Sequence, residues 1–369
     1  MIAKVEYGSM AKVLMAMSGG VDSSVAAALL QQDGHEVVGC FMRLGNVGDG
    51  LDETRDISIK HKGCCSINDA HDARHVSAKL GITFYALDFK DDFGRIIDYF
   101  VDEYNAGRTP NPCVRCNDWL KFGRLHEYAR SIDAEFVASG HHAQIIEGDD
   151  GSQLHMGADD SKDQSYVLFG ASRERIAEMI LPIGHLQKSE VRELARKFDL
   201  PVFDKPDSQD ICFVPDDDYA GMIERRSPGS LQKGDILDVD GNIVGQHDGQ
   251  QKYTIGQRRG IGISMPEPAY IIAKNPKLNT VTIGGEKLLN CITIRATKTN
   301  WLIDPPSEWI ECVAKIRYNT KAASARVKQD EDEIEVVFDE PQRGGAPGQA
   351  VVCYQGTRVI CGGWIDRVT

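Results

Sequence analysis

A short run of glycines and serines near the start of the chain could bind the phosphates of a nucleotide. The run SGGVDSS occupies residues 18–24, between an apolar stretch of strand length at 12–17 and a helix-forming stretch that starts at residue 21 and stops at Gly34. Glycines let the backbone approach a phosphate closely, the serines add hydroxyl donors, and the amides at the start of a helix favour an anion. A glycine-rich turn with serine helix caps is the alternative. The chain contains no GxxxxGKS/T sequence, so the lysine that usually contacts the phosphates is missing.

Two segments that contain cysteine could transfer sulfur: GRTPNPCVRCN at 107–117 and DSQDICF at 207–213. Sulfur transfer needs one cysteine that carries a persulfide and a second thiol that completes the transfer. Both must be partly exposed and lean toward the thiolate. Cys116 lies in a proline-rich loop that opens a helix, with two basic side chains nearby, and these features favour the thiolate. Cys212 follows acidic residues and precedes apolar ones, so its neighbours in the sequence do not favour the thiolate.

The same cysteines could instead hold a metal. Cys113 and Cys116 form a CxxC pair that could be half of a zinc site, and the adjacent Cys64 and Cys65 could complete it, although their spacing is poor for zinc. An iron–sulfur cluster on Cys113, Cys116 and Cys212 is a second alternative, because thiolate clusters can use widely spaced ligands. Four further cysteines lie in apolar, strand-like surroundings, where burial as small hydrophobic residues is expected. These are Cys291, Cys312, Cys353 and Cys361.

Composition is that of a globular protein with more than one domain: 369 residues, of which 41% are hydrophobic and 26% charged. No stretch approaches the roughly 18 to 20 apolar residues of a membrane helix, and the N-terminus lacks the features of a secretion signal. We therefore expect a cytoplasmic protein that does not enter a membrane. The formal charge of −13 argues against a protein that coats nucleic acid. It leaves an RNA enzyme open, because binding responds to local patches.

The first part of the chain alternates strands and helices. This order implies a parallel sheet covered by helices, with active-site loops at the carboxyl ends of the strands. Asn68 is expected to cap one helix and Gly81 to end it. The expected strands are 12–17, 36–44, 83–89 and 135–142, and the expected helices begin at 21, cover 67–81 and cover 118–131.

The pattern changes after residue 213. Asp-Gly turns between short runs of alternating polarity predict β-hairpins, and from about residue 286 a series of short strands predicts a barrel or sandwich. We therefore predict a catalytic α/β domain at 1–213, a small β-rich central domain at 214–285 and a C-terminal β-barrel domain at 286–369.

The loop SGGVDSS resembles the PP-loop of ATP pyrophosphatases, enzymes that split ATP between the α and β phosphates and leave an adenylated substrate. This resemblance alone leaves open GMP, NAD and argininosuccinate synthetases and several tRNA-modifying enzymes. Further motifs narrow the choice among these enzymes: GRTPNPCVRCN, ASGHHAQ, KDQSYVL, DSQDICF and YTIGQRRGIGI. In this order, and from residue 12 to about 365, they resemble the bacterial tRNA-specific 2-thiouridylases. The resemblance implies an adenine nucleotide alpha hydrolase-like domain with a parallel sheet, followed by the two β domains.

The resemblance also implies roles for individual residues. Cys116 matches the family's nucleophile and Cys212 the cysteine that receives the persulfide, while some members lack a cysteine at the position of Cys113. No role follows for the polar segment 45–66. The positions that match the ATP site are Ala16, Met17, Ser18, Gly19, Gly20, Val21, Asp22, Ser23, Met42 and Gly140. The positions that match tRNA contacts are Asn111, Pro112 and Cys113, which face the target base, and His141, Lys162, Asp163, Gln164, Arg317, Tyr318 and Gln349.

The implied reaction is 2-thiolation of the wobble uridine of Lys, Glu and Gln tRNAs. ATP with Mg²⁺ adenylates the uracil 2-oxygen, and sulfur carried on Cys212 then replaces it. Cys116 either attacks the persulfide, forming a disulfide with Cys212, or activates the base directly. A persulfide-donating sulfur-relay protein or a cysteine desulfurase would supply the sulfur. Asp22 could position Mg²⁺ or cap the helix that follows the loop.

Charge placement bears on RNA binding. Residues 315–328 carry five basic side chains and no acid, a patch suited to phosphates, and Tyr318 could stack on an unpaired base. A solvated barrel face is the alternative.

Two other functions remain open from the residues themselves. A PP-loop amide-forming ligase of the argininosuccinate-synthetase type needs ATP and amino-acid pockets but no cysteine pair. A sulfur-carrier or RNA-binding protein with a vestigial loop would bind tRNA without producing AMP.

Overall fold

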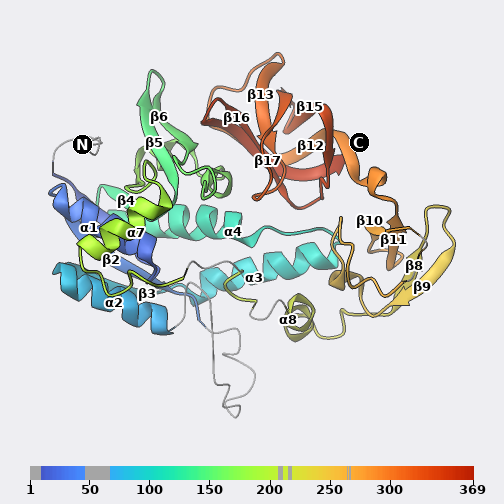
Figure 1. The fold of residues 1–369 in the computed structure, drawn as a ribbon, viewed down its shortest axis with the longest axis horizontal. Helices are drawn as coiled ribbons and strands as arrows, with labels where there is room; N and C mark the ends of the chain where they lie inside the picture. The colour runs from blue at the N-terminus through green and yellow to red at the C-terminus, as the bar shows by residue number, and fades with distance from the viewer. Residues whose placement is uncertain (1–9, 46–66, 207–210, 215–217, 264, 266) are drawn as a thin grey trace, which may run out of the picture. The chain divides into compact units, whose positions relative to one another are not determined.

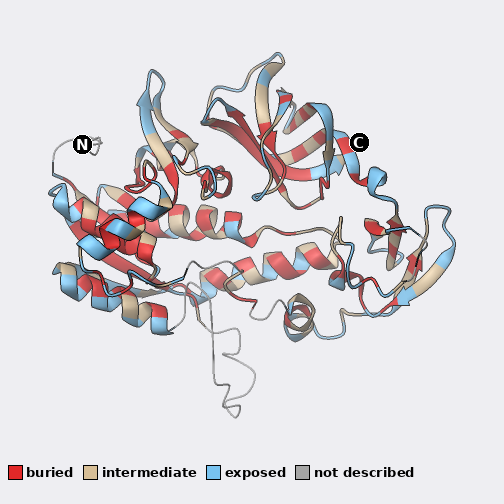
Figure 2. Cartoon of the chain, in the orientation of Figure 1, coloured by how far each residue is buried: buried red, intermediate tan, exposed pale blue. Residues whose placement is uncertain are grey.

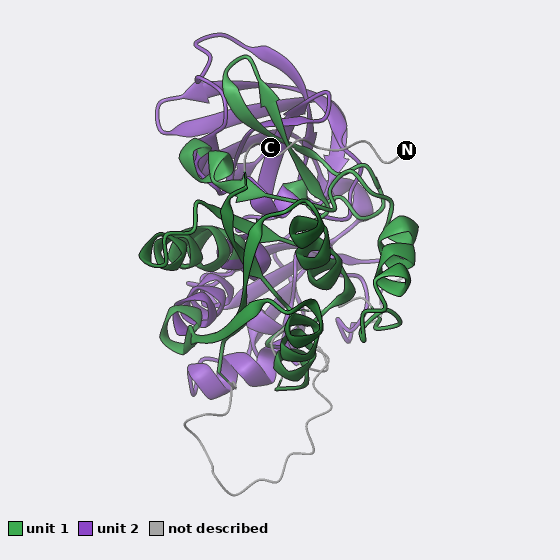
Figure 3. Ribbon diagram, turned by 90° about the vertical axis from the view of Figure 1, so that its left-hand side faces the viewer, with its two compact units in different colours: residues 1–93, 117–165, 173–213 green, residues 94–116, 166–172, 214–369 purple. Residues whose placement is uncertain are grey.

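The computed structural model describes residues 10–45, 67–206, 211–214, 218–263, 265 and 267–369 (Figure 1). The chain divides into two compact units, each assembled from separate segments (Figure 3). The first contains residues 1–93, 117–165 and 173–213, and the second contains 94–116, 166–172 and 214–369. Each unit is described by itself. No helix among the described residues is long and apolar enough to cross a membrane.

The first unit is built on a five-stranded parallel sheet with the strand order β3-β2-β1-β4-β7. The central strand is buried almost throughout, which explains its uninterrupted apolar sequence (Figure 2). The expected strands are confirmed, although the fourth is shorter than predicted. The bounds are β1 Lys12–Ala16, β2 Glu36–Arg43, β3 Thr83–Asp88, β4 Phe136–Ser139 and β7 Met179–Ile180.

The strand order places a topological switch point at β1. The chain runs from β1 outward to β2 and β3 and then returns to the other side of β1 with β4. Ligands of open α/β sheets bind outside the carboxyl ends of the strands at such a point. The loop SGGVDSS follows β1 and therefore begins at this position.

Helices complete the first unit. Gly81, at φ +68, ends α2 as expected. The expected cap at Asn68 is wrong, because α2 already begins at Ile67 and Asn68 lies in its first turn. The elements are α1 Val21–Gln32, α2 Ile67–Leu80, α5 Leu125–Ser131, α6 Arg173–Ala177 and α7 Lys188–Lys197, with a hairpin of β5 Ala143–Gly148 and β6 Gly151–Met156.

The second unit contains two β structures. Six antiparallel strands run in the order β12-β15-β14-β13-β16-β17, and β12 also pairs with β17, so the sheet closes into a barrel around an apolar core. This confirms the barrel prediction. Its strands are β12 Asn290–Trp301, β13 Ile310–Lys315, β14 Ala323–Asp330, β15 Glu333–Arg343, β16 Ala350–Gln355 and β17 Arg358–Val368. Cys291, Cys353 and Cys361 are buried as expected, whereas Cys312 is only partly buried.

The central β structure is a four-stranded sheet with the order β10-β11-β8-β9. The hairpin expected around an Asp-Gly turn is confirmed as β8 and β9. Its strands are β8 Gly234–Leu237, β9 Ile243–His247, β10 Tyr270–Asn275 and β11 Thr280–Gly284.

Besides α6 and α7, the helices α3 Lys90–Asn105 and α8 Tyr219–Arg226 were not predicted. The sequence signal for α3 exists, because its buried residues Phe93, Ile96, Phe100 and Tyr104 recur at helical spacing.

Candidate active site

The phosphate loop is a tight connection between β1 and α1. Gly19 has φ +72, and a Cβ atom there would lie 2.2 Å from the carbonyl oxygen of Asp69. Both the conformation and the contact therefore require glycine. The serine hydroxyls hold the loop itself: Ser24 Oγ donates to the carbonyl of Gly20 over 2.8 Å, and Ser23 Oγ accepts from the Ser18 amide over 3.1 Å. In this state the serines thus shape the loop.

Gly140 shows how closely β4 approaches the start of α1. It follows β4, and a Cβ atom at this position would lie 2.5 Å from the backbone nitrogen of Ser23 and 2.6 Å from the carbonyl carbon of Asp22. Only glycine fits such a contact without moving one of the two backbones. Met42, the other ATP position outside the loop, is buried near the carboxyl end of β2, which pairs with β1. The structure thus brings these two positions to strands that neighbour the loop.

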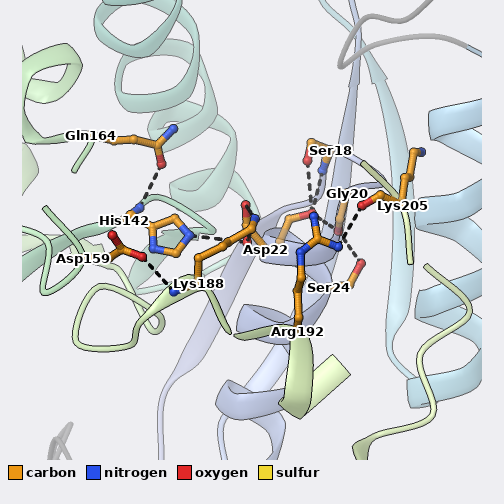
Figure 4. Close-up of polar contacts among 11 residues, drawn as sticks. Ser18, Gly20, Asp22, Ser24, His142, Asp159, Gln164, Lys188, Arg192 and Lys205 are labelled. Atoms are coloured by element: carbon orange, nitrogen blue, oxygen red, sulfur yellow. Dashed lines mark hydrogen bonds and ion pairs between the residues drawn. The ribbon is translucent and has the colours of Figure 1, made fainter. Parts of the chain in front are cut away.

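Asp22 forms an ion pair and does not cap α1. The cap residue is Gly20, and no side chain caps this helix end. Lys188 Nζ instead lies 2.6 and 2.7 Å from the two carboxylate oxygens of Asp22, and His142 Nε2 lies 3.4 Å from one of them (Figure 4). Burial raises the pKa of Asp22, but the hydrogen bond with His142 and the charge of Lys188 outweigh it and hold the pKa below its usual value. The carboxylate is therefore ionised.

A second lysine lies on the other side of the loop. Lys205 Nζ donates to the carbonyl of Gly19 over 3.0 Å and to the carboxylates of Asp69 and Asp72 over 2.7 and 2.5 Å. Sequence reasoning missed both lysines, because Lys188 is 166 residues from Asp22 in the chain and Lys205 is 186 residues from Gly19. No local motif connects them with the loop.

His141 is a buried neutral histidine. Lys121 Nζ lies 3.3 Å from its Nε2, and Ser139 Oγ lies 2.7 Å from its Nδ1. An ammonium can only donate, so Nε2 accepts and Nδ1–H donates to the serine. Burial, followed by the charge of Lys121, lowers the pKa of His141 well below its usual value.

The first three residues of the motif KDQSYVL, which are Lys162, Asp163 and Gln164, differ in their surroundings. Asp163 is buried, and its Oδ1 accepts from the amides of Gly157 and Ser165 over 3.1 and 3.0 Å. Gln164 Oε1 accepts from the amide of His142 over 2.9 Å. Gln164 thus holds the backbone at His142 and Asp163 holds the backbone at Gly157 and Ser165, while Lys162 is half-buried.

In the second unit, the segment that carries Cys116 is helical. Asn111 caps it, with its Oδ1 accepting from the amide of Val114 over 3.3 Å, and Pro112 occupies the first helical position. The helix α4 Pro112–Arg115 leads into the π-helix η1 Cys116–Arg124. The expectation that Cys116 lies in a loop before the helix is therefore wrong, because the Asn-Pro cap starts the helix four residues earlier. Cys113 is exposed and Cys116 is half-buried.

A turn of the barrel holds the residues before α4. Gln349 Nε2 donates to the carbonyls of Thr109 and Pro110 over 3.2 and 3.1 Å, and the amide of Thr109 donates to the carbonyl of Pro347 over 2.8 Å. Gln349 thus binds the segment that leads to Cys116.

Arg115, which precedes Cys116, is fixed by two aromatic rings. It is buried, and its guanidinium carbon lies 4.1 Å from the ring centroid of Trp364 on β17 and 5.3 Å from that of Tyr99 on α3. Such cation–π contacts are strongest where water is excluded. Together with the Gln349 bonds, they fix both ends of α4.

Tyr166 packs against Tyr318, a position that the family resemblance assigned to tRNA binding. Its hydroxyl donates to the carbonyl of Ala350 over 2.9 Å, and its ring centroid lies 6.2 Å from that of Tyr318. Tyr318 is 37% exposed, whereas Arg317 is half-buried and donates through Nε to the carbonyl of Gly344 over 3.0 Å. Tyr166 is fully buried, so these contacts belong to the packed interior of the unit.

The basic run 315–328 is not a uniformly exposed patch. Arg326 and Lys328 lie over the ring of Trp309, at 4.9 and 4.8 Å from its centroid. Lys328 also pairs with Glu335 over 3.3 Å, and Lys315 is buried. Part of this charge is therefore directed at the barrel itself.

Cys212 belongs to the first unit and Cys116 to the second. Cys212 is half-buried, and the adjacent Phe213 packs edge-on against Phe93 with ring centroids 5.5 Å apart. Cys64 and Cys65 lie outside the described residues.

The described residues contain no group of three or more His, Cys, Asp or Glu side chains that could hold a metal ion. The zinc and iron–sulfur alternatives therefore gain no ligand set here. Mg²⁺ is different, because it uses one or two carboxylates together with substrate phosphates. The ionised carboxylate of Asp22, at the phosphate loop, fits that requirement.

Three family models match consecutive parts of the chain. The "tRNA methyl transferase HUP domain" matches residues 11–216, the "tRNA methyl transferase PRC-barrel domain" residues 222–285 and the "Aminomethyltransferase beta-barrel domain" residues 292–365.

Curated relatives match over nearly their whole length. The tRNA-specific 2-thiouridylase MnmA of Rhodopirellula baltica is 44% identical over 390 residues, covering 97% of this chain and 97% of its own. The enzyme of that name from Geotalea uraniireducens is 45% identical over 359 residues, covering 96% of this chain and 95% of its own. Among solved structures, the NMN synthetase from Francisella tularensis is 21% identical and covers 55% of this chain and 67% of its own, with a TM-score of 0.33, which is too low to carry an argument.

We predict that Gly140→Ala destabilises the protein by about 1 to 3 kcal/mol, because the new methyl group overlaps the backbone at the start of α1. Urea unfolding of both proteins measures the difference. Gly285→Ala is the control, since a Cβ atom at Gly285 has nothing within 4 Å. Equal stability of the Gly140 variant and the wild type would contradict the close approach.

We predict that Tyr166→Phe lowers the free energy of unfolding by about 1 to 2 kcal/mol, because the carbonyl of Ala350 loses its buried donor. Chemical denaturation provides the measurement. Tyr85→Phe, at a tyrosine that is 44% exposed, should change stability by less than about 0.5 kcal/mol. Similar losses in the two variants would show that burial of the hydroxyl does not matter.

Stability should depend on the protonation of His141. Its pKa in the folded state lies well below the unfolded value of 6.5, so the unfolded state binds more protons at acid pH. The stability that the neutral imidazole contributes is present above pH 6.5 and is lost as the pH falls below that value. Unfolding free energies at pH 7.5 and 5.5 should therefore differ less in His141→Gln than in the wild type. An unchanged difference would mean that the pKa of His141 is the same in the folded and the unfolded protein.

Proposed function

The chain belongs to the tRNA-specific 2-thiouridylase family, and from this membership we propose how its residues move sulfur to tRNA. The enzyme is a sulfurtransferase that uses ATP and replaces the 2-oxygen of a uridine in tRNA with sulfur. The observation that carries this function is 44% identity with curated 2-thiouridylases over 97% of the chain. The family-model descriptions mention methyl transfer, and the residues alone left a ligase open. Neither reaction would give the two cysteine segments a role.

We assign ATP to the switch point of the parallel sheet. The SGGVDSS amides at the start of α1 receive phosphate, Gly140 leaves room for the backbone beside them, and Met42 contributes an apolar side chain for the adenosine. Asp22 would hold Mg²⁺, which supplies positive charge to the phosphates when bound. The observation behind this assignment is a glycine-dependent loop at the strand ends where α/β sheets bind ligands.

The reaction begins with activation of the base. The uracil 2-oxygen attacks the α-phosphorus of ATP, the bond from that phosphorus to the bridging oxygen breaks, and pyrophosphate leaves. The adenylated oxygen can then depart as AMP when sulfur attacks carbon 2. Backbone amides at a helix start suit this step, because they stabilise charge that develops on phosphate oxygens.

Cys212 carries the incoming sulfur as a persulfide, and Cys116 completes the transfer. The terminal sulfur of a persulfide needs two electrons to become the sulfur of a thiocarbonyl group. The thiolate of Cys116 provides them when it bonds to the sulfur of Cys212, which leaves a Cys116–Cys212 disulfide. A thiol reductant then restores both cysteines. The electron balance is the same whether the sulfur is first released as hydrogen sulfide or passes directly to the base.

The second unit supplies the contacts around the target base. Asn111, Pro112 and Cys113 lie on or beside the helix that carries Cys116, and Gln349 holds the segment that leads to it. Tyr318 exposes an aromatic ring that could stack on RNA. The target is the wobble uridine of Lys, Glu and Gln tRNAs, turned out of its stack so that Cys116 and Cys212 can act on it.

The proposal also includes the sulfur donor and the cellular location of the reaction. A persulfide-donating relay protein or a cysteine desulfurase charges Cys212, and the reaction takes place in the cytoplasm. We keep the division into domains at 1–213, 214–285 and 286–369 as part of the proposal.

The test combines purified protein, ATP with Mg²⁺, a persulfide donor and unmodified tRNA with a wobble uridine. We predict that Cys116→Ser and Cys212→Ser each reduce 2-thiouridine by at least about a thousandfold, as expected when a nucleophile is removed. Mass spectrometry quantifies 2-thiouridine, AMP and pyrophosphate. Cys312→Ser, at a half-buried cysteine on β13 that takes no part in the proposed reaction, should keep most of the activity and serves as the matched control. Thiolation that persists in both serine variants would refute the two-cysteine mechanism, and AMP without any 2-thiouridine in the wild type would refute the proposed sulfur transfer.

A further inference from the structure

The phosphate loop needs positive charge that its own sequence does not provide. ATP brings several negative charges, whereas the start of a helix contributes only about half a positive charge. In loops of the GxxxxGKS/T type, a lysine within the motif reaches the phosphates. In the part of the chain that the structure describes, two lysines far from the loop in the sequence hydrogen-bond to its residues, Lys188 to Asp22 (Figure 4) and Lys205 to Gly19.

The two lysines make different contacts at the loop. Lys205 contacts two carboxylates, those of Asp69 and Asp72, so this group carries a net negative charge. It also bonds the carbonyl of Gly19, an acceptor that fixes the loop. These contacts suit a residue that joins α2 to the loop. They do not suit a residue that attracts phosphate.

Lys188 forms an ion pair with the carboxylate of Asp22. Asp22 lies in the first turn of α1, so the ammonium of Lys188 is held beside the amides that face a bound anion. The lysine side chain is 12% exposed and the carboxylate 32%. An anion that replaced Asp22 as its partner would meet an ammonium already desolvated and in place.

The backbone of Lys188 is fixed independently of this ion pair. Lys188 is the first residue of α7, which begins with a capping box between Gln187 and Glu190. Its amide donates to Asp159 over 3.0 Å. Val191, Leu194 and Ala195 of α7 belong to the same core as α1. The helix therefore presents a flexible side chain from a rigid base.

We infer that Lys188 is the phosphate-binding lysine of this loop, held beside α1 by Asp22 until the phosphates of ATP take the place of that carboxylate. The inference rests on the proposed function, because it takes ATP to bind at SGGVDSS. Lys188 keeps an anionic partner throughout the exchange, so its charge is never left unpaired. The exchange also releases the carboxylate of Asp22, the residue assigned above to Mg²⁺.

The first test measures nucleotide affinity in Lys188→Met, which keeps the length of the side chain and removes its charge. Equilibrium dialysis gives the affinities for ATP and for AMP. We expect ATP to bind about 10- to 100-fold more weakly, as for the loss of a charged hydrogen bond, and AMP to bind nearly as in the wild type, because it lacks the β- and γ-phosphates. Lys197→Met is the matched control, since Lys197 is an exposed lysine on the same helix. Lys188→Arg should recover part of the ATP affinity.

A second variant separates binding from folding. Lys188→Met leaves the carboxylate of Asp22 without this partner, which can lower stability. The double variant Asp22→Asn with Lys188→Met removes that charge, so its thermal midpoint should recover while its ATP affinity stays below that of Asp22→Asn alone, which has lost the proposed Mg²⁺ ligand but keeps the lysine.

Two results would overturn the inference: ATP affinity that is unchanged in Lys188→Met, or equal losses for ATP and AMP in the folded double variant. A wild-type protein that binds no ATP and forms no pyrophosphate would instead contradict the proposed function. The two failures are therefore distinguishable.

Discussion

The close approach of β4 to the start of α1 is the constraint on which the first unit depends. The backbone at Gly140 lies so near to Asp22 and Ser23 that a single methyl group does not fit. On the side of α2, the backbone at Gly19 lies equally close to the backbone of Asp69. The amides of the loop are thereby held at the carboxyl end of β1 before any ligand arrives. Binding then costs little conformational entropy, because the loop is already ordered.

Charge around the loop is arranged in pairs. Asp22 with Lys188, and Asp69 and Asp72 with Lys205, place carboxylates where a site for phosphate would be expected to avoid them. These ion pairs keep the side chains around the loop ordered whether or not a phosphate is bound. An isolated ammonium in a partly buried position is costly, whereas a paired one is held in place and can exchange its partner.

The second unit positions its cysteine by a different means. The helix that leads to Cys116 starts at an Asn-Pro cap, and the barrel binds it at both ends through Gln349 and through the ring of Trp364 against Arg115. The barrel therefore supports the segment that leads to Cys116. A side chain on a segment held in this way keeps its orientation.

The sequence by itself determined the features that depend on neighbours in the chain. The strands of the parallel sheet and the barrel appear as apolar or alternating runs, the loop SGGVDSS as a glycine turn between a strand and a helix, and Cys116 and Cys212 as members of long motifs. Such signals are local, because they come from periodicity, turn chemistry and helix starts. Even here Asn68 and the start of the helix before Cys116 were placed wrongly, since helix boundaries depend on competing caps. Only the tertiary structure decided that Lys188 and Lys205 lie at the loop, that Asp22 is paired, and that Gln349 holds the segment before Cys116. These contacts join residues far apart in the chain, and they follow from the strand order and from the packing of α7 on α1, which no local pattern contains.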